Sequence, residues 1–216
     1  MGNSLSKFDF AELPFLRSKR IVTLDISDSI IKYVEVDFTG PKPRIASFDL
    51  IPLPANFKQI SDKDKQQEVV FSLIQESFDK NKVQAKDIAF VISGGSVFSR
   101  KIRIPKLGAK ERESGIKWEA SNQIPFSLDS SYFDWQLLRE VTMPDGSRND
   151  EYMIAASSRR TVDEMIEVGL RLGLHPICVG IPIFAIFNLV MISPQFDTDE
   201  RIAVIDIGPR RTNITI

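Results

Sequence analysis

The sequence predicts an α/β fold built from two related halves, and we expect this chain to hold the first half and the start of the second. Strand-like runs of β-branched residues alternate with helical patterns along the 216 residues. The run IVTLDIS, which contains Asp25, has the same order as IAVIDIG, which contains Asp206: an apolar strand, an acid, and a tight polar turn. Because the sequence ends inside an apolar strand, we expect a longer protein.

The first third of the chain predicts three strands and a helix. Residues 21–26, 30–36 and 44–51 are β-branched or alternating runs separated by turns. Ile31 and Tyr33 alternate with Lys32 and Val34, as expected of a strand with one buried face. A helix then begins at a cap formed by Ser61 or Asp62 and places its apolar residues on one face.

The middle third predicts strands around a second helix. Residues 88–93 form a buried strand, and we expect 97–104 to pair with it through the turn Ser93-Gly94-Gly95-Ser96. A helical pattern follows over 108–126 and is stopped by Pro125. Two more strands are expected at 132–141 and 152–156.

The last third predicts a helix over 161–172 that ends at Gly173, a short strand over 177–180, and a mostly buried helix over 182–191. Strands 201–206 and 212–216 complete the pattern.

Composition excludes several classes of protein. The 28 basic and 29 acidic side chains provide no electrostatic footprint for nucleic acid. A single cysteine and a single histidine exclude a disulfide framework and a Cys/His zinc site. The polar N-terminus lacks the apolar core of a signal peptide, and the apolar run 179–192 is too short to span a bilayer. We therefore expect a cytoplasmic protein.

The two acidic turns predict phosphate chemistry. An aspartate at a strand end orients magnesium or water, and the backbone N–H groups of the following turn face phosphate oxygens. Lys32, in the strand after Asp25, adds a positive charge to such a site. The plainer alternative is that Asp25 and Asp206 cap turns, which is an ordinary use of aspartate.

The motifs together resemble the actin-like PilM family of type IV pilus assembly. DISDSIIK (25–32) and DIGPRRTNITI (206–216) resemble the two phosphate motifs of actin-like ATPases. Between them, RKIRIP (100–105), IKWEA (116–120) with QIPF (123–126), and FDWQL (133–137) resemble PilM segments in the same order. FtsA of cell division and the type II secretion L protein are related families.

The resemblance implies an actin-like, ribonuclease H-like fold with an inserted small α+β subdomain. Its parts are a tail (1–18), a first actin-like subdomain (19–102 and 159–195), the insert (103–158), and the start of a second subdomain (196–216). It also implies a cytoplasmic scaffold at the inner face of the bacterial inner membrane, attached through partners. Those partners are the N-terminal peptide of a PilN-like protein, the membrane platform and the motor.

The resemblance places ATP and magnesium between the two motifs. The nucleotide-site residues it implies are Asp25, Ser27, Lys32, Asp206, Gly208, Arg210, Arg211 and Thr212, with Asp25 and Asp206 on the metal.

Departures from the motifs predict a degenerate site. Ser27 stands where glycine is expected, and its Cβ narrows the space for a phosphate. Pro209 removes one backbone donor, and Arg210 and Arg211 either grip phosphate or occupy its place. We expect weak ATP binding at most and no hydrolysis. The alternatives are an active actin-fold ATPase or sugar kinase, and an FtsA-like or secretion adaptor.

Four side chains outside these motifs receive structural interpretations. We expect Trp118 and Trp135 to be core anchors of the insert, Cys178 to be a buried small hydrophobe, and His175 to be a structural or surface histidine.

Overall fold

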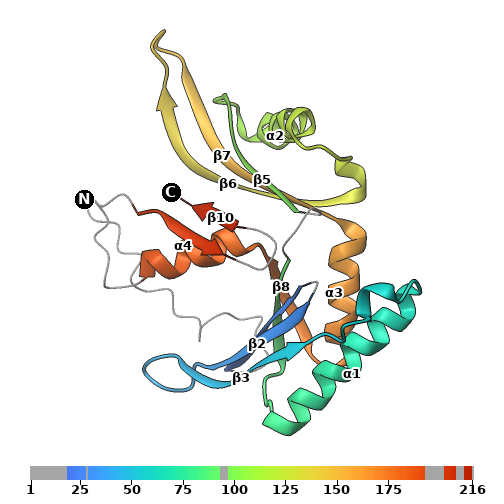
Figure 1. The fold of residues 1–216 in the computed structure, drawn as a ribbon. Coiled ribbons are helices and arrows are strands. Elements are labelled where there is room, and N and C mark those ends of the chain that lie inside the picture. The colour runs from blue at the N-terminus through green and yellow to red at the C-terminus, as the bar shows by residue number, and fades with distance from the viewer. Residues whose placement is uncertain (1–18, 28, 93–96, 193–201, 208–211, 216) are drawn as a thin grey trace. The chain divides into compact units, whose positions relative to one another are not determined.

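The protein folds into two compact units, which are drawn in Figure 1. The structure, a computed structural model, describes residues 19–27, 29–92, 97–192, 202–207 and 212–215. Unit 1 takes the described residues up to Ile92 and those from Met165 onward, and unit 2 takes those from Val97 to Glu164. Unit 2 is wider than the insert expected over 103–158, because its edge strand begins at Val97.

Unit 1 is built on a five-stranded mixed sheet with the order β3-β2-β1-β4-β8. Its strands are β1 (Arg20–Ile26), β2 (Ile30–Asp37), β3 (Arg44–Pro52), β4 (Asp87–Val91) and β8 (His175–Gly180). The first three strands are antiparallel neighbours, whereas β4 runs parallel to both β1 and β8. Parallel neighbours need long connections, which here contain α1 (Lys63–Asn81) and all of unit 2.

One face of this sheet packs against helices. The alternation expected in β2 is confirmed, since Ile31 and Tyr33 are buried while Lys32 and Val34 are exposed. The buried side chains join those of α1 in a single core: Val22, Leu24, Ile31, Tyr33, Ile51, Val70, Ile74, Phe78, Ile88 and Phe90. Asp62 caps α1, as expected, by accepting the backbone N–H groups of Asp64 and Lys65.

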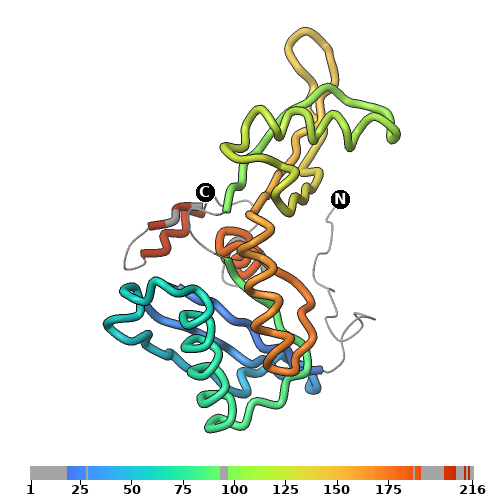
Figure 2. Tube along the Cα trace, turned by 90° about the vertical axis from the view of Figure 1, so that its right-hand side faces the viewer, coloured from blue at the N-terminus to red at the C-terminus, as the bar shows by residue number. Residues whose placement is uncertain are grey.

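The last turns of α3 (Arg159–Arg171) pack on the same face. Gly169 lies so close to the sheet that a Cβ there would come within 3.0 Å of Phe90 and 3.1 Å of Ile88. The Arg171 guanidinium reaches the Glu68 carboxylate of α1 at 2.8 Å. The two helices therefore run beside one another over the sheet, as Figure 2 shows.

Unit 2 contains a three-stranded antiparallel sheet, the helix α2 (Ala109–Gln123), a short 3-10 helix (Leu128–Ser130) and the first turns of α3. The strands β5 (Val97–Pro105), β7 (Arg148–Ser158) and β6 (Ser131–Thr142) pair in that order. The helix α2 buries Ile116 and Ala120 against them. Trp135 packs edge-on against Tyr152 with ring centroids 5.5 Å apart, so it is a core anchor as expected.

The described chain ends with a helix and a hairpin. These are α4 (Pro182–Ile192), β9 (Val204–Ile207) and β10 (Thr212–Thr215). The strands β9 and β10 pair only with each other among the described residues. Neither α4 nor any other described helix is long and apolar enough to cross a membrane.

Four expectations are wrong. β4 and β5 do not pair; β4 lies between β1 and β8, and β5 pairs with β7, because the two strands belong to different units. Trp118 is 69% exposed, since Ile116 and Ala120 already form the buried side of α2. The helix α4 is not mostly buried, because residues such as Leu189 face outward, and Cys178 is exposed on the edge strand β8. The expected turn at 93–96 and the tail 1–18 lie outside the described residues.

Candidate functional site

Asp25 and Lys32 face each other across the first hairpin. The two residues are direct partners in the antiparallel register of β1 and β2. The Lys32 ammonium lies 3.7 Å from Asp25 Oδ2. Asp25 also neighbours Val91 of β4, so the acid sits at the strand end where the hairpin joins the parallel part of the sheet. Strand pairing therefore brings the side chains of Asp25 and Lys32 into contact.

The surroundings of Asp25 disfavour the ionised form of its carboxyl group. Burial raises its pKa above the ordinary value of 3.8, the Lys32 ammonium opposes that rise, and the nearby Asp206 carboxylate adds to it. Its Oδ1 atom is buried and has no hydrogen-bond partner among the described residues. A buried acceptor without a partner is costly, so this oxygen is suited to receive a cation or an ordered water.

The second acid approaches the first from the second hairpin. Asp206 lies in β9 opposite Asn213 of β10, and Thr212 lies opposite Ile207. The Asp206 carboxylate is the smallest of the causes that act on the pKa of Asp25, although most of the chain separates the two acids in sequence. Gly208, Arg210 and Arg211 lie outside the described residues.

The turn after Asp25 is closed by Ser27. Its backbone N–H donates to the Ile30 carbonyl at 3.0 Å, and its hydroxyl donates to the same carbonyl at 2.8 Å. The Ile30 N–H in turn donates to the Ser27 hydroxyl at 3.3 Å. Two backbone donors are therefore engaged within the turn itself and do not face a phosphate.

These residues fit a cation better than they fit a phosphate. Mg²⁺ is commonly held by one or two carboxylates together with water and phosphate oxygens, and Asp25 and Asp206 supply two carboxylates of this kind. No group of three or more His, Cys, Asp or Glu side chains among the described residues is close enough to enclose a metal. Bound magnesium would supply positive charge to phosphate oxygens, whereas the Ser27 turn contributes little to holding them.

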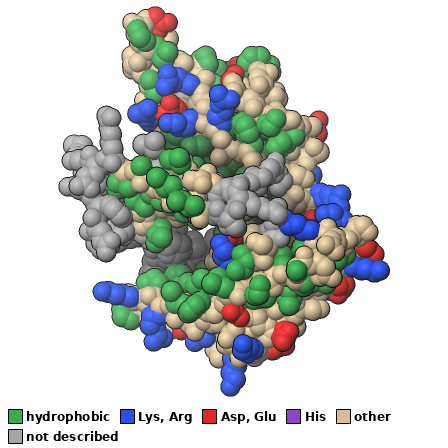
Figure 3. Space-filling model, in the orientation of Figure 1, with side chains coloured by type: hydrophobic (Ala, Val, Ile, Leu, Met, Phe, Trp, Pro, Cys, Tyr) green, Lys and Arg blue, Asp and Glu red, His purple; other side chains and the backbone are tan. Residues whose placement is uncertain are grey.

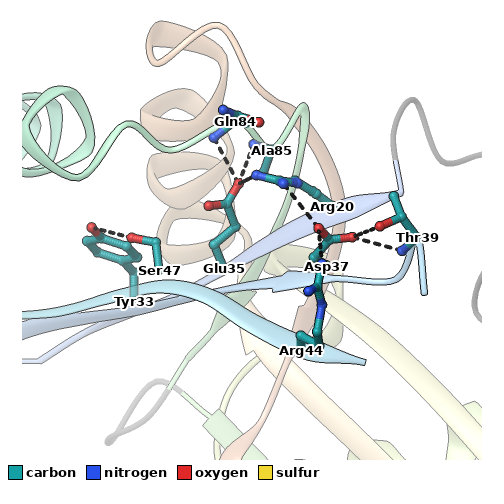
Figure 4. A network of polar contacts seen from close by, with 9 residues as sticks. All are labelled: Arg20, Tyr33, Glu35, Asp37, Thr39, Arg44, Ser47, Gln84 and Ala85. Carbon is teal, nitrogen blue, oxygen red and sulfur yellow. Dashed lines mark hydrogen bonds and ion pairs between the residues drawn. The ribbon is translucent and has the colours of Figure 1, made fainter. Parts of the chain in front are cut away.

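Two polar contacts in unit 1 were missed by the sequence reasoning. His175 Nδ1 lies 3.1 Å from Oδ1 of the fully buried Asp87. At the far end of the first hairpin the buried Glu35 accepts the backbone N–H groups of Gln84 and Ala85 at 2.8 and 2.7 Å (Figure 4). Sequence separations of 88, 49 and 50 residues hide these contacts from any local pattern.

Asp37 completes that polar network. It accepts from Thr39 and lies 3.1 Å from Arg20 and 3.5 Å from Arg44 (Figure 4). The Thr39 hydrogen bonds, and then the two arginines, lower its pKa. The network joins the ends of β1, β2 and β3 that lie opposite to the Asp25–Lys32 end of the hairpin.

The sheet topology and the two acidic hairpins place the protein in the actin-like fold class. Residues 23–216 match the family described as type IV pilus assembly protein PilM, and the chain belongs to this family. This membership favours the pilus family over the FtsA-like and secretion alternatives.

Two solved structures illustrate the likeness. A chain of a PilM-PilN type IV pilus biogenesis complex is similar with a TM-score of 0.73 at 23% identity, over 92% of this chain and 57% of that one. The cytoplasmic domain of EpsL, an inner-membrane component of the type II secretion system of Vibrio cholerae, is similar with a TM-score of 0.48 at 8% identity, over 74% of this chain and 57% of that one. The chain thus spans little more than half of either structure.

Proposed function

We propose that this chain is the N-terminal portion of a non-catalytic scaffold of type IV pilus assembly, which binds the cytoplasmic N-terminal peptide of a PilN-like membrane protein. Membership of the PilM family carries the proposal. The similar solved structure is a PilM-PilN complex, which supports a PilN-like partner. The scaffold would lie at the cytoplasmic face of the bacterial inner membrane, held there through its partners and linking the membrane platform to the motor.

The closed turn at Ser27 supports the non-catalytic part of this proposal. Phosphate recognition at a turn needs several backbone N–H groups that point outward. The N–H groups of Ser27 and Ile30 bond within the turn instead. Lys32, the point charge available for phosphate, is also engaged with Asp25 at 3.7 Å. ATP would thus meet a site with fewer donors than the motif normally presents.

A second function is favoured by one specific observation. Asp25 Oδ1 is buried without a partner among the described residues, and its neighbour Asp206 brings a second negative charge. A bound Mg²⁺ would relieve both the missing contact and the like-charge repulsion. The alternative is therefore a nucleotide-binding scaffold in which magnesium-ATP acts as a ligand that shifts peptide affinity, since such coupling is reciprocal.

The deciding experiment is a titration of the full-length parent protein with a fluorescent N-terminal peptide of its PilN-like partner. We expect saturable binding whose affinity changes less than twofold when magnesium-ATP is added. Loss of binding for a scrambled peptide is the matched control. Absence of any peptide binding would contradict the proposed function, and a large shift in affinity with magnesium-ATP would establish the alternative.

One variant tests whether the closed turn at Ser27 limits nucleotide binding. Ser27→Gly removes the hydroxyl that closes the turn and restores the glycine of the motif. If the degenerate turn limits nucleotide binding, calorimetry with magnesium-ATP should detect tighter binding in Ser27→Gly than in the unaltered protein. Ser29→Gly, two residues along the same loop, is the control that changes backbone freedom without removing these hydrogen bonds.

A further inference from the structure

The second face of the unit 1 sheet carries an open apolar surface over β2 and β3. Ile45, Phe48 and Leu50 of β3 are 67%, 66% and 59% exposed, and Val34 of β2 is 36% exposed. The strand register pairs Val34 with Phe48, Val36 with Ile45 and Lys32 with Leu50. These side chains therefore share one face, opposite to the face that packs on α1. We call Val34, Ile45, Phe48 and Leu50 the open apolar face, and Figure 3 shows hydrophobic side chains gathered over these strands.

Such a surface is expected to have an occupant. Isolated exposed hydrophobic residues are normal, but a continuous group of large ones along neighbouring strands marks a contact surface. β3 is also an edge strand of nine residues, and it carries apolar residues on the open side rather than the charges that usually protect such edges.

We propose that the N-terminal segment of this same chain, residues 1–18, is the occupant of the open apolar face. The segment contains five large apolar side chains among its last eleven residues: Phe8, Phe10, Leu13, Phe15 and Leu16. A stretch so rich in phenylalanine and leucine gains free energy by leaving water, at roughly 25 cal/mol per Å² of apolar surface. The proposal stands on the sheet and on this sequence, and is independent of the proposed function.

The point where the segment joins the sheet favours this occupant. The Phe38 N–H donates to the Lys19 carbonyl at 2.8 Å, so the chain enters β1 beside the end of β2. Arg20 pairs with Asp37, and Asp37 pairs with Arg44, so the segment leaves the sheet at the end where β3 begins. Strands lie about 4.8 Å apart, so crossing from β1 to β3 takes about 10 Å, which three or four residues span.

The length and charge of residues 1–18 are also compatible with binding to the open apolar face. After that crossing, residues 8–13 reach about 20 Å when extended, which exceeds the roughly 17 Å between Ile45 and Leu50 along β3. Asp9 and Glu12 fall in this stretch. The rim of the open apolar face carries two basic side chains that remain partly exposed: Lys32, which also contacts Asp25, and Arg44, which also contacts Asp37.

A disulfide trap tests the proposal. In a Cys178→Ser background, Phe10→Cys is combined with Phe48→Cys, and Leu13→Cys with Ile45→Cys, the pairs expected from a segment running antiparallel to β3. The control combines Phe10→Cys with Leu170→Cys, a position on α3 that is 60% exposed. We expect the two test pairs to form intramolecular disulfides at least tenfold faster than the control under mild oxidation, at a rate independent of protein concentration.

Three results would overturn the proposal. Equal rates for test and control pairs would mean that the segment has no preference for this face. Disulfides that are intermolecular and rise with concentration would assign the face to a second copy of the chain. If the test pairs fail in the full-length parent protein, while amides of residues 44–52 exchange slowly there, another part of the longer protein or a partner covers the face.

A second measurement does not depend on cysteine chemistry. Phe8→Glu with Phe10→Glu places charge in the proposed contact, so deuterium uptake by residues 44–52 should rise several-fold. Asn3→Glu with Ser4→Glu adds the same charge outside the proposed contact and should leave the uptake unchanged. An equal response to both variants would also overturn the proposal.

Discussion

The two hairpins that carry the paired acids share a sequence pattern but differ in their surroundings. The first, β1–β2, lies in the middle of a five-stranded sheet, and its Leu24 and Ile31 are completely buried. In the second, β9–β10, Ile205 and Ile214 are 58% and 59% exposed, and its two strands pair only with each other among the described residues. A local pattern is thus sufficient to specify a hairpin, whereas burial is supplied by elements that are distant in the chain.

The largest effect expected from this difference comes from removing an isoleucine of each hairpin. Ile31→Ala deletes a side chain of the unit 1 core and should lower the free energy of unfolding by about 3 kcal/mol. Ile214→Ala removes a largely exposed side chain and should change it by less than about 0.5 kcal/mol in this chain. Urea unfolding followed by circular dichroism measures both, and similar losses would show that the second hairpin is buried in solution.

The next largest effect concerns the buried carboxylate that anchors the first hairpin. Glu35→Leu leaves the N–H groups of Gln84 and Ala85 without their acceptor and should cost about 2 kcal/mol. Glu35→Gln keeps an oxygen at that position and should cost clearly less. If the two variants lose the same stability, the charge rather than the hydrogen bonds is what matters at Glu35.

A smaller effect is expected at the turn of the first hairpin. Ser27→Gly removes the hydroxyl contacts with Ile30 and adds backbone freedom to the unfolded chain, so the free energy of unfolding should fall by about 1 kcal/mol. Ser27→Thr retains the hydroxyl and should lose less. An unchanged stability in Ser27→Gly would mean that the closed turn does not persist in solution.

The smallest expected effect is a gain in stability, in contrast to the losses above, and it depends on pH. The pKa of Asp25 is raised on folding, so its contribution to stability is fully present below the unfolded value of 3.8 and is lost as pH rises through the folded pKa. The ionised group therefore opposes folding at pH 7. Asp25→Asn should melt at a slightly higher temperature than the unaltered chain at pH 7, and this advantage should vanish as pH falls below 4.

Asp206→Asn tests how much the Asp206 carboxylate contributes to the pKa of Asp25. Because the Asp206 carboxylate contributes only the last of the causes that shift the pKa of Asp25, its removal should lower that pKa by less than a loss of burial would. Titration of the Asp25 carboxyl carbon by NMR detects the change. No movement of the Asp25 titration in Asp206→Asn would mean that the two hairpins do not approach each other in solution.

Local patterns predicted the elements of the fold well because those patterns have local causes. The alternation of Ile31 and Tyr33 with Lys32 and Val34 follows from the two-residue period of a strand that has one buried face. The Asp62 cap and the helix end near Gly173 follow from backbone groups that need partners within a turn. The pairing of Asp25 with Lys32 has the same local cause, since a hairpin brings those two positions opposite each other.

Tertiary structure alone decided the features that depend on distant partners. No local rule separates β4 from β5, because the choice depends on which sheet each strand joins. Trp118 is as apolar as Trp135, yet among the described residues only Trp135 meets a neighbouring ring, because the packing side of each element is set by the whole unit. The approach of Asp206 to Asp25 and the contact of His175 with Asp87 follow from the same cause. Short-range periodicity indicates which residues are suited to burial. The residues they pack against are determined only by how distant elements come together.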